Sequence, residues 1–260
     1  MALRLSTALR NIVLARQPLA QAMDNCVLKL YTGSQPTSAD AAPTGTLLCT
    51  YSASSGALTR EVLAVGSATI AGGSGSVSTF TLNSIEIMGA SVPYNTSVAQ
   101  TATDVATQIN NNPANTYVVA STTGSSGVVT LTAKPGYGAL MNTWVLAGTG
   151  STMTVTQAAA MTGGIAAVNG LKWTNPAVAG VLSALASQTW SGVAGNTGTA
   201  GWFRFEGSVS DSGALDSTYV WPRIDGAVST SGAELNLSST TITSGATQTV
   251  STFTITLPTA

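Results

Sequence analysis

Hydrophobic and polar residues alternate along short segments through most of the chain, and this period of two is typical of β-strands. Phe203 and Phe205 share one face of a strand expected over 202–206. The other face of that strand carries Trp202, Arg204 and Glu206. Equally clear segments are 26–31, 46–51, 234–242 and 248–257.

Turn-forming residues follow these segments at intervals of about 8–12 residues, as in β-sandwiches. Residues 243–247 have a hairpin signature between the last two segments. The ambiguous stretch 177–190 favours strands at 180–184 and 188–190. We therefore expect a mainly β fold, with an antiparallel β-sandwich or jelly-roll-like domain.

A short amphipathic helix is predicted over residues 3–16, before Pro18. Its apolar positions recur at helical spacing, at Leu5, Leu9, Ile12 and Val13. Its arginines, at positions 4, 10 and 16, fall evenly around the helix and make no basic face. A helix docked on protein is therefore expected in preference to a targeting or membrane-surface helix.

The sequence pattern changes between residues 66 and 164, where short strand-like segments surround one helical segment. Ser97 and Gln100 have the spacing of a capping box, and residues 110–113 (Asn-Asn-Asn-Pro) stop the helix that follows it. Strands are expected around it at 117–121, 128–133, 143–147 and 152–157. The glycine-rich runs at 71–75 and 162–164 are interpreted as connections between this module and the rest of the chain. We therefore expect an α+β module, 66–164, inserted into a β domain formed by 1–65 and 165–260.

Charge is scarce, and this limits the possible functions. The 260 residues include 9 Lys and Arg, 10 Asp and Glu and no His, with a formal net charge of −1. Binding to nucleic acid normally needs clustered basic residues, so it is not expected. A nearly neutral protein has little repulsion between its copies, which permits self-association. No apolar run approaches the roughly 18 residues that a membrane span needs.

The sequence contains no clear arrangement of catalytic residues. A nucleophilic triad lacks its histidine, and a Ser-Lys pair would have to use Lys29, Lys134 or Lys172, none of which lies in a recognisable motif. Two Cys without His give no zinc spacing, and no cofactor motif is present. We therefore expect no catalytic, cofactor-binding or metal-binding residues.

The nearest acidic cluster is Glu206, Asp211, Asp216 and Asp225. We expect these acids to serve turns, where Asp bonds to nearby backbone. Two alternatives stay open, which are a carboxylate pair for glycoside hydrolysis and a Ca²⁺ site at 211–216. Cys26 and Cys49 are expected to be small buried side chains, although an antiparallel hairpin could place them opposite each other.

Large aromatic residues concentrate in the C-terminal half of the chain, at Trp173, Trp190, Trp202, Tyr219 and Trp221. Such residues can form a stacking platform for a glycan, or they can pack a core or a subunit interface. Without several exposed aromatic residues in a row, packing is the favoured interpretation.

Several short sequence segments resemble segments of a family of small virion-associated proteins of tailed bacteriophages. They are residues 3–12, 30–48, 198–205, 222–226 and 235–240, so the resemblance covers roughly 1–60 and 165–260. The central segments 101–109, 117–121 and 128–134 are similar to small α+β modules inserted in phage tail and other virion proteins.

This resemblance implies a structural role in the particle and no catalytic residues. The expected function is a capsid decoration or head-to-tail-region protein, assembled in the bacterial cytoplasm. The expected partners are other copies of the chain and capsid, portal or tail subunits, with no nucleic acid and no membrane. The alternative is a receptor- or glycan-binding module of a tail or head fibre, and a depolymerase or hydrolase is the weakest hypothesis.

Overall fold

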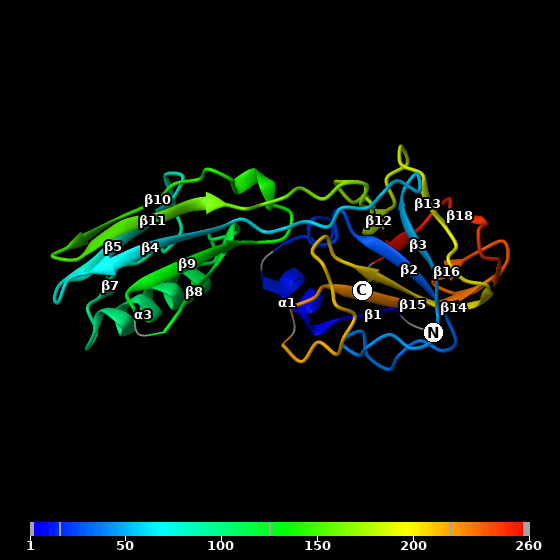
Figure 1. The fold of residues 1–260 in the computed structure, drawn as a ribbon, viewed down its shortest axis with the longest axis horizontal. Helices are drawn as coiled ribbons and strands as arrows, with labels where there is room; N and C mark the ends of the chain where they lie inside the picture. Colours follow the sequence, from blue (N-terminus) through cyan, green and yellow to red (C-terminus); the bar gives the residue numbers. More distant parts are fainter. Residues whose placement is uncertain (1–2, 16, 125, 219, 257–260) are drawn as a thin grey trace. The chain divides into compact units, whose positions relative to one another are not determined.

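The computed structural model describes residues 3–15, 17–124, 126–218 and 220–256 (Figure 1). Strands account for 42% of the chain and helices for 12%, so the fold is mainly β, as predicted. The chain divides into two compact units. Unit 1 is Met1–Arg60 with Ala167–Ala260, and unit 2 is Glu61–Ala166.

Unit 1 is built on one large sheet with the strand order β1-β15-β14-β2-β3-β13-β18. The bounds are β1 Arg4–Leu5, β2 Val27–Thr32, β3 Leu47–Ala53, β13 Trp190–Val193, β14 Gly198–Glu206, β15 Arg223–Ser229 and β18 Thr247–Val250. Neighbours along this order are antiparallel. Two short strands extend it, β16 (Leu235–Asn236) parallel to β15 and β17 (Thr241–Ile242) antiparallel to β14.

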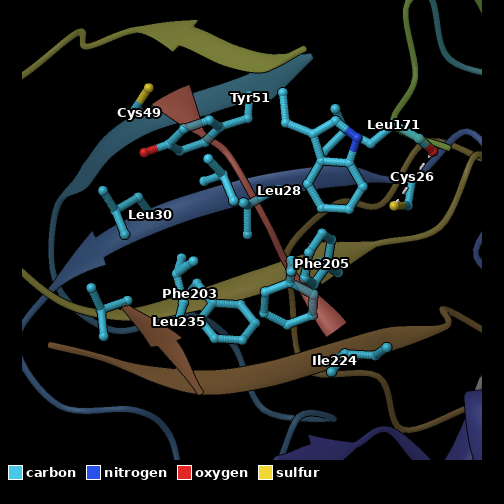
Figure 2. Close-up of a cluster of buried hydrophobic side chains, with 14 of the residues drawn as sticks. Cys26, Leu28, Leu30, Cys49, Tyr51, Leu171, Phe203, Phe205, Ile224 and Leu235 are labelled. Carbon is cyan, nitrogen blue, oxygen red and sulfur yellow. Dashed lines mark hydrogen bonds between the residues drawn. The ribbon is translucent and has the colours of Figure 1, made fainter. Parts of the chain in front are cut away.

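One face of this sheet carries the core of unit 1. Phe203 and Phe205 of β14 lie on it, as the alternation predicts, and both are fully buried. Figure 2 shows their rings meeting side chains of β2, β3 and β15, among them Leu28 and Tyr51. A two-stranded sheet, β12 (Val181–Ser183) with β19 (Thr254–Thr256), adds its own apolar residues to the same cluster. The arrangement is sandwich-like.

The C-terminal segments differ from their prediction. Residues 234–242 form two short strands, β16 and β17, and residues 248–257 contribute to two others, β18 and β19. The expected hairpin across 243–247 is wrong, because β17 pairs with β14 whereas β18 pairs with β13. Strand pairing here is set by distant segments, which a local turn signature cannot reveal.

The N-terminal helix is shorter than predicted. Residues Arg4–Leu5 pair with β15 as a strand, so α1 spans Thr7–Ala15, and α2 (Leu19–Ala22) follows. The Ser6 hydroxyl accepts a hydrogen bond from the Leu9 backbone N–H at 3.2 Å, which is the N-cap pattern. Leu9 is fully buried in the core of unit 1, while Leu14 is 85% exposed. The helix is therefore docked on its own unit through one narrow face.

Unit 2 contains two four-stranded sheets and one long helix. The first sheet has the order β11-β4-β9-β8, with β4 Val65–Ala71, β8 Val118–Thr122, β9 Val128–Ala133 and β11 Thr154–Thr162. The second has β10 Leu146–Ser151, β5 Ser76–Leu82 and β6 Ile85–Glu86 in order, with β7 Val92–Pro93 also on β5. A 3₁₀ turn spans Ala139–Met141.

The glycine-rich run at 71–75 does not separate domains. It joins β4 to β5 inside unit 2, so it is a connection between the two sheets of that unit. The pattern of β4, Val-Gly-Ser-Ala-Thr-Ile-Ala, gives a weak signal because its buried positions are mostly small residues. The sequence analysis missed β4 for this reason, and it also missed β5, although β5 buries Val77, Phe80 and Leu82.

Helix α3, Val98–Asn111, confirms the predicted central helix. The Ser97 hydroxyl accepts from the Gln100 N–H at 3.1 Å, which is one half of a capping box. The second half is not formed, because the Ser97 backbone N–H donates to the Asn95 carbonyl and not to the Gln100 side chain. Asn110 has a role beyond ending the helix, since its amide both donates to the Ala120 carbonyl and accepts from the Ala120 N–H. This side chain therefore pairs with the outer edge of β8 as a neighbouring strand would.

Candidate functional site

The second face of the large sheet in unit 1 is also buried, and it carries the charges of the strands. These residues are Arg204 and Glu206 on β14 and Arg223 and Asp225 on β15, each with 0% exposure. The two arginines bond to two long connections, 33–46 between β2 and β3 and 207–222 between β14 and β15. Buried charges are tolerated when they are paired and hydrogen-bonded, so each ion needs its partners identified.

Arg204 and Asp225 form a bidentate ion pair. They lie directly opposite each other in the β14–β15 ladder, and both N–H···O distances, from Nε and Nη2, are 2.7 Å. The third donor, Nη1, reaches the Ala41 carbonyl at 3.0 Å. Burial raises the pKa of Asp225 above its ordinary value, against the opposing effect of the Arg204 guanidinium. The pair thus fixes one loop to two strands.

Arg223 is the centre of this network. Its Nε and Nη2 bond to the two oxygens of Asp211 at 2.6 Å each. Its Nη1 lies 3.2–3.3 Å from the carbonyls of residues 39, 40 and 41, and its Nη2 also donates to the Ala214 carbonyl at 2.9 Å. Burial alone would lower the pKa of Arg223, but the hydrogen bond and the charge of Asp211 raise it overall. One guanidinium therefore holds both loops.

Glu206 has two cationic partners. Lys29 on β2 approaches one carboxylate oxygen at 2.7 Å, and Arg60 approaches the other at 2.5 Å. Arg60 also donates to the Gly207 carbonyl at 2.7 Å. The cations are 21% and 19% exposed, so the solvent screens them in part, whereas the carboxylate is fully buried.

Asp216 and Asp40 extend the network through backbone groups. Asp216 accepts from the N–H groups of Val220 at 3.1 Å and Trp221 at 2.8 Å. Burial alone would raise the pKa of Asp216, but these hydrogen bonds lower it below its ordinary value. Asp40 accepts from the Thr7 N–H at 2.8 Å, at the first turn of α1. The N-terminal helix is thereby tied to the same loops.

This geometry corrects the interpretation of the acidic cluster. Glu206 and Asp225 do not serve turns, because they lie in strands and neutralise buried cations. Asp211 and Asp216 do accept from nearby backbone, as turns require, but Asp211 is also ion-paired. The four carboxylates that the Ca²⁺ hypothesis for 211–216 and the glycoside-hydrolysis hypothesis would use each bind Arg, Lys or backbone N–H groups. Among the described residues, no group of three or more His, Cys, Asp or Glu is arranged to hold a metal ion.

The aromatic residues singled out in the sequence mostly pack inside unit 1. Trp173 and Trp190 lie in the core, with ring centroids 5.2 Å apart in an edge-to-face arrangement. Trp202 is fully buried on the charged face and stacks on Tyr31 at 4.5 Å. Trp221 is half-buried with the Arg223 guanidinium 5.2 Å from its ring, and Tyr219 lies outside the described residues. The three buried tryptophans offer no face to a ligand.

The cysteines and lysines are also placed. In the β2–β3 ladder Cys49 lies opposite Leu30, so the hairpin does not bring it to Cys26, and both thiols are free. Burial raises the pKa of Cys26 to about 12 and that of Cys49 to about 11. Lys134 is buried and donates to the Asn115 carbonyl, while Lys172 is exposed. Lys29 is committed to Glu206.

Two surface features were missed by the sequence analysis. A shallow depression of about 550 Å³ lies on the 33–46 loop of unit 1, lined by Ser34, Gln35, Pro36, Thr37, Ala41, Ala42, Thr44 and Gly45, none of them charged. In unit 2, Tyr117, Tyr137 and Trp144 form a partly exposed aromatic cluster, with Tyr117 5.5 Å from Tyr137 and 5.8 Å from Trp144. These three come from separate segments, so no motif connects them in the sequence.

No family model matches the chain, and no curated protein or solved structure matches it significantly. Within the part of the chain that the structure describes, no helix has the length and apolar character needed to cross a membrane.

Proposed function

We propose that this chain is a non-enzymatic structural component of a bacteriophage virion, most specifically a capsid decoration or head-to-tail-region protein. It acts through self-assembly and through contacts with other virion subunits, and it is assembled in the bacterial host cytoplasm. The sequence resemblance described above motivates this class of function. The observation that carries the proposal is the use of charge inside unit 1.

Unit 1 directs its charges inward. Arg204, Arg223, Glu206 and Asp225 are fully buried and hold long loops against the sheet. Outside this network, the exposed positions of the described strands carry mainly Ser, Thr, Ala and Val. Covering such a surface in an assembly costs little, because few charges must be desolvated. An assembly subunit needs this property, whereas a freely soluble enzyme gains from surface charge.

The same network supports the absence of catalysis. A general acid or base needs a titratable group that can reach a substrate. Glu206, Asp211, Asp216 and Asp225 are saturated by arginine, lysine or backbone donors, and they hold loops in place. The hydrogen bonds and ion pairs of these four carboxylates therefore have a structural role in the fold.

The test is the location of the chain in a particle. Virions purified from an infected host should contain the chain at a stoichiometry that fits particle symmetry, measured by quantitative mass spectrometry. Cryo-electron microscopy should then place it at the head surface or the neck. Its absence from virions that retain infectivity would overturn the proposal.

A second candidate function, recognition of a host glycan by a fibre-type module, is favoured by one observation. Tyr117, Tyr137 and Trp144 are partly exposed and lie together, and aromatic rings of this kind stack on sugars. We expect Trp144→Ala to abolish saturable binding to host polysaccharide if this function operates. Trp221→Ala, which changes a half-buried ring in the other unit, is the matched control. Equal binding by both variants and the wild type would exclude this cluster as the site.

A further inference from the structure

Gln35, in the loop between β2 and β3, carries a buried amide group that has no partner. Neither its Nε2 nor its Oε1 atom forms a hydrogen bond. Among the described residues, the Tyr51 hydroxyl is the other buried side-chain group without a partner, and it lies in the core of unit 1. Burial of a polar group without a hydrogen bond is unfavourable and rare in folded proteins, so the Gln35 amide needs an explanation.

Gln35 also lines the shallow depression on the 33–46 loop. The volume of this depression, about 550 Å³, lies within the range of about 300–1,000 Å³ that is usual for small-ligand sites. Its lining residues are uncharged, and Pro36, Ala41 and Ala42 give it an apolar surface. A ligand that fits here is therefore recognised by hydrogen bonds and apolar contact, and not by charge.

The loop is fixed in place by the interior of unit 1. Arg204 donates to the Ala41 carbonyl at 3.0 Å, and the Trp202 indole donates to the Thr44 carbonyl at 3.2 Å. A surface that is already ordered loses little entropy when a ligand binds. The buried network thus leaves the loop rigid, with the Gln35 amide as a donor and acceptor that the fold does not use.

We propose that this depression binds an extended, uncharged segment of a partner protein, with the Gln35 amide paired to the N–H and C=O groups of one backbone residue. A side-chain amide has its donor and its acceptor next to each other. The N–H and C=O groups of one residue in an extended strand point to the same side, so one amide can bond both. Asn110 makes this pair of bonds with Ala120 in unit 2, at 2.8 and 2.9 Å.

The amide of Gln35 can reach such a segment. The residue is partly exposed, and its side chain has several rotatable bonds, so the amide can turn from its buried position to the depression. It has no hydrogen bond to lose in the buried position, whereas pairing with a backbone residue gives both of its polar atoms a partner. The inference rests on the proposed function for its biological setting and names the chemistry of one partner contact.

The experiment is a titration of the full-length chain, followed in NMR spectra through the Gln35 side-chain signal and the backbone signals of residues 33–46. The first probe is an alanine tripeptide with an acetylated N-terminus and a methylamidated C-terminus. It should bind with a dissociation constant of about 1–10 mM. The second probe is N-methylacetamide, whose single trans peptide group points its N–H and C=O in opposite directions. It should bind at least about tenfold more weakly, since it can make only one of the two bonds.

Gln35→Met separates loss of the site from damage to the fold. Because the amide has no partner in the free protein, this variant should keep or raise the thermal stability while it weakens tripeptide binding at least about tenfold. Gln100→Met, at an exposed position of unit 2, is the matched control and should bind as the wild type does. A loss of stability in Gln35→Met would show that the amide holds a structural water only, and this result would overturn the inference.

Two further results would contradict the proposed site. One is the absence of signal changes in the wild type at about 50 mM tripeptide, or equal binding by Gln35→Met. The other is tighter binding of N-acetylglucosamine than of the tripeptide, which would assign the depression to a glycan. These measurements need no particle, so a chain that fails them can still be found in virions, and a chain absent from virions can still bind the tripeptide.

Discussion

The two units differ in how many charged residues they contain and in how their sheets are tied to neighbouring segments. Fifteen of the 19 charged residues belong to unit 1 and four to unit 2. Unit 1 uses Arg204 and Arg223 to hold two long loops against the second face of its sheet. Unit 2 has small uncharged residues such as Thr69 and Thr130 on the second face of its first sheet, and it joins its helix to a strand edge with the neutral amide of Asn110.

The difference follows from loop length. A long loop that covers a sheet brings many backbone carbonyls with it, and these need donors. A guanidinium supplies five donors in a rigid fork, so one arginine can bond several carbonyls and a carboxylate together. A sheet face without a covering loop needs no such donor. The buried arginines of unit 1 therefore lie where long loops are bound to the sheet.

Removal of the central arginine, Arg223, is expected to have the largest effect on unit 1. Arg223→Ala removes the cationic partner of the buried Asp211 carboxylate and one donor to the carbonyls of 39–41, which is expected to cost unit 1 about 3–5 kcal/mol. Hydrogen exchange followed by mass spectrometry should show lost protection in 33–46 and 207–222, with unit 2 unchanged. Arg10→Ala, at an exposed position of α1, is the control. Equal loss of protection in both units would contradict the separate roles.

The corresponding change in unit 2 is Asn110→Ala. It leaves the buried N–H and carbonyl of Ala120 without partners, which is expected to cost about 1–3 kcal/mol. Exchange should accelerate in α3 and β8 and stay unchanged in unit 1. The neighbouring Asn111 is exposed, so Asn111→Ala should have little effect. Similar effects of the two variants would show that the edge of β8 does not depend on the amide.

Acid should act on the unit 1 network through Asp216. Because the pKa of Asp216 is lowered in the folded chain, its stabilisation is present above the unfolded-state value near 4 and is lost as pH falls through the folded value. Asp216→Asn should therefore flatten the decrease in unit 1 stability below about pH 4. Asp225, whose pKa is raised, has the opposite effect on the pH dependence of stability. It is present in both the wild type and Asp216→Asn, so the difference between their pH profiles reports the effect of Asp216. Parallel pH profiles for the two proteins would refute this role.

The smallest expected effect is on the rate at which a reagent labels the two thiols of the native protein. Both cysteines lie in unit 1, and burial raises the pKa of Cys26 to about 12 and that of Cys49 to about 11. A chromogenic disulfide reagent at pH 8 should label neither in the native chain and both in denaturant. Labelling should accelerate in Arg223→Ala and not in Asn110→Ala, which makes it a probe of unit 1 alone. Rapid labelling of the native wild type would show that unit 1 opens without disruption of the network.

Features that depend on local periodicity could be predicted from the sequence. Alternation placed Phe203 and Phe205 in the core, and the Ser97 cap with its helical spacing located α3. It also supported the mainly β class. These signals are local because a strand repeats every two residues and a helix every 3.6.

The residues that cover each face of a sheet could not be predicted from local patterns. The alternation of β14 separates Phe205 from Arg204, but nothing local states that Arg204 is fully buried under residues from a loop more than 150 positions away. Helix α1 begins at Thr7 because Arg4–Leu5 pairs with β15, and β17 bonds to β14 in place of its sequence neighbour. These outcomes depend on which distant backbone groups meet and need partners, and that is a property of the assembled fold.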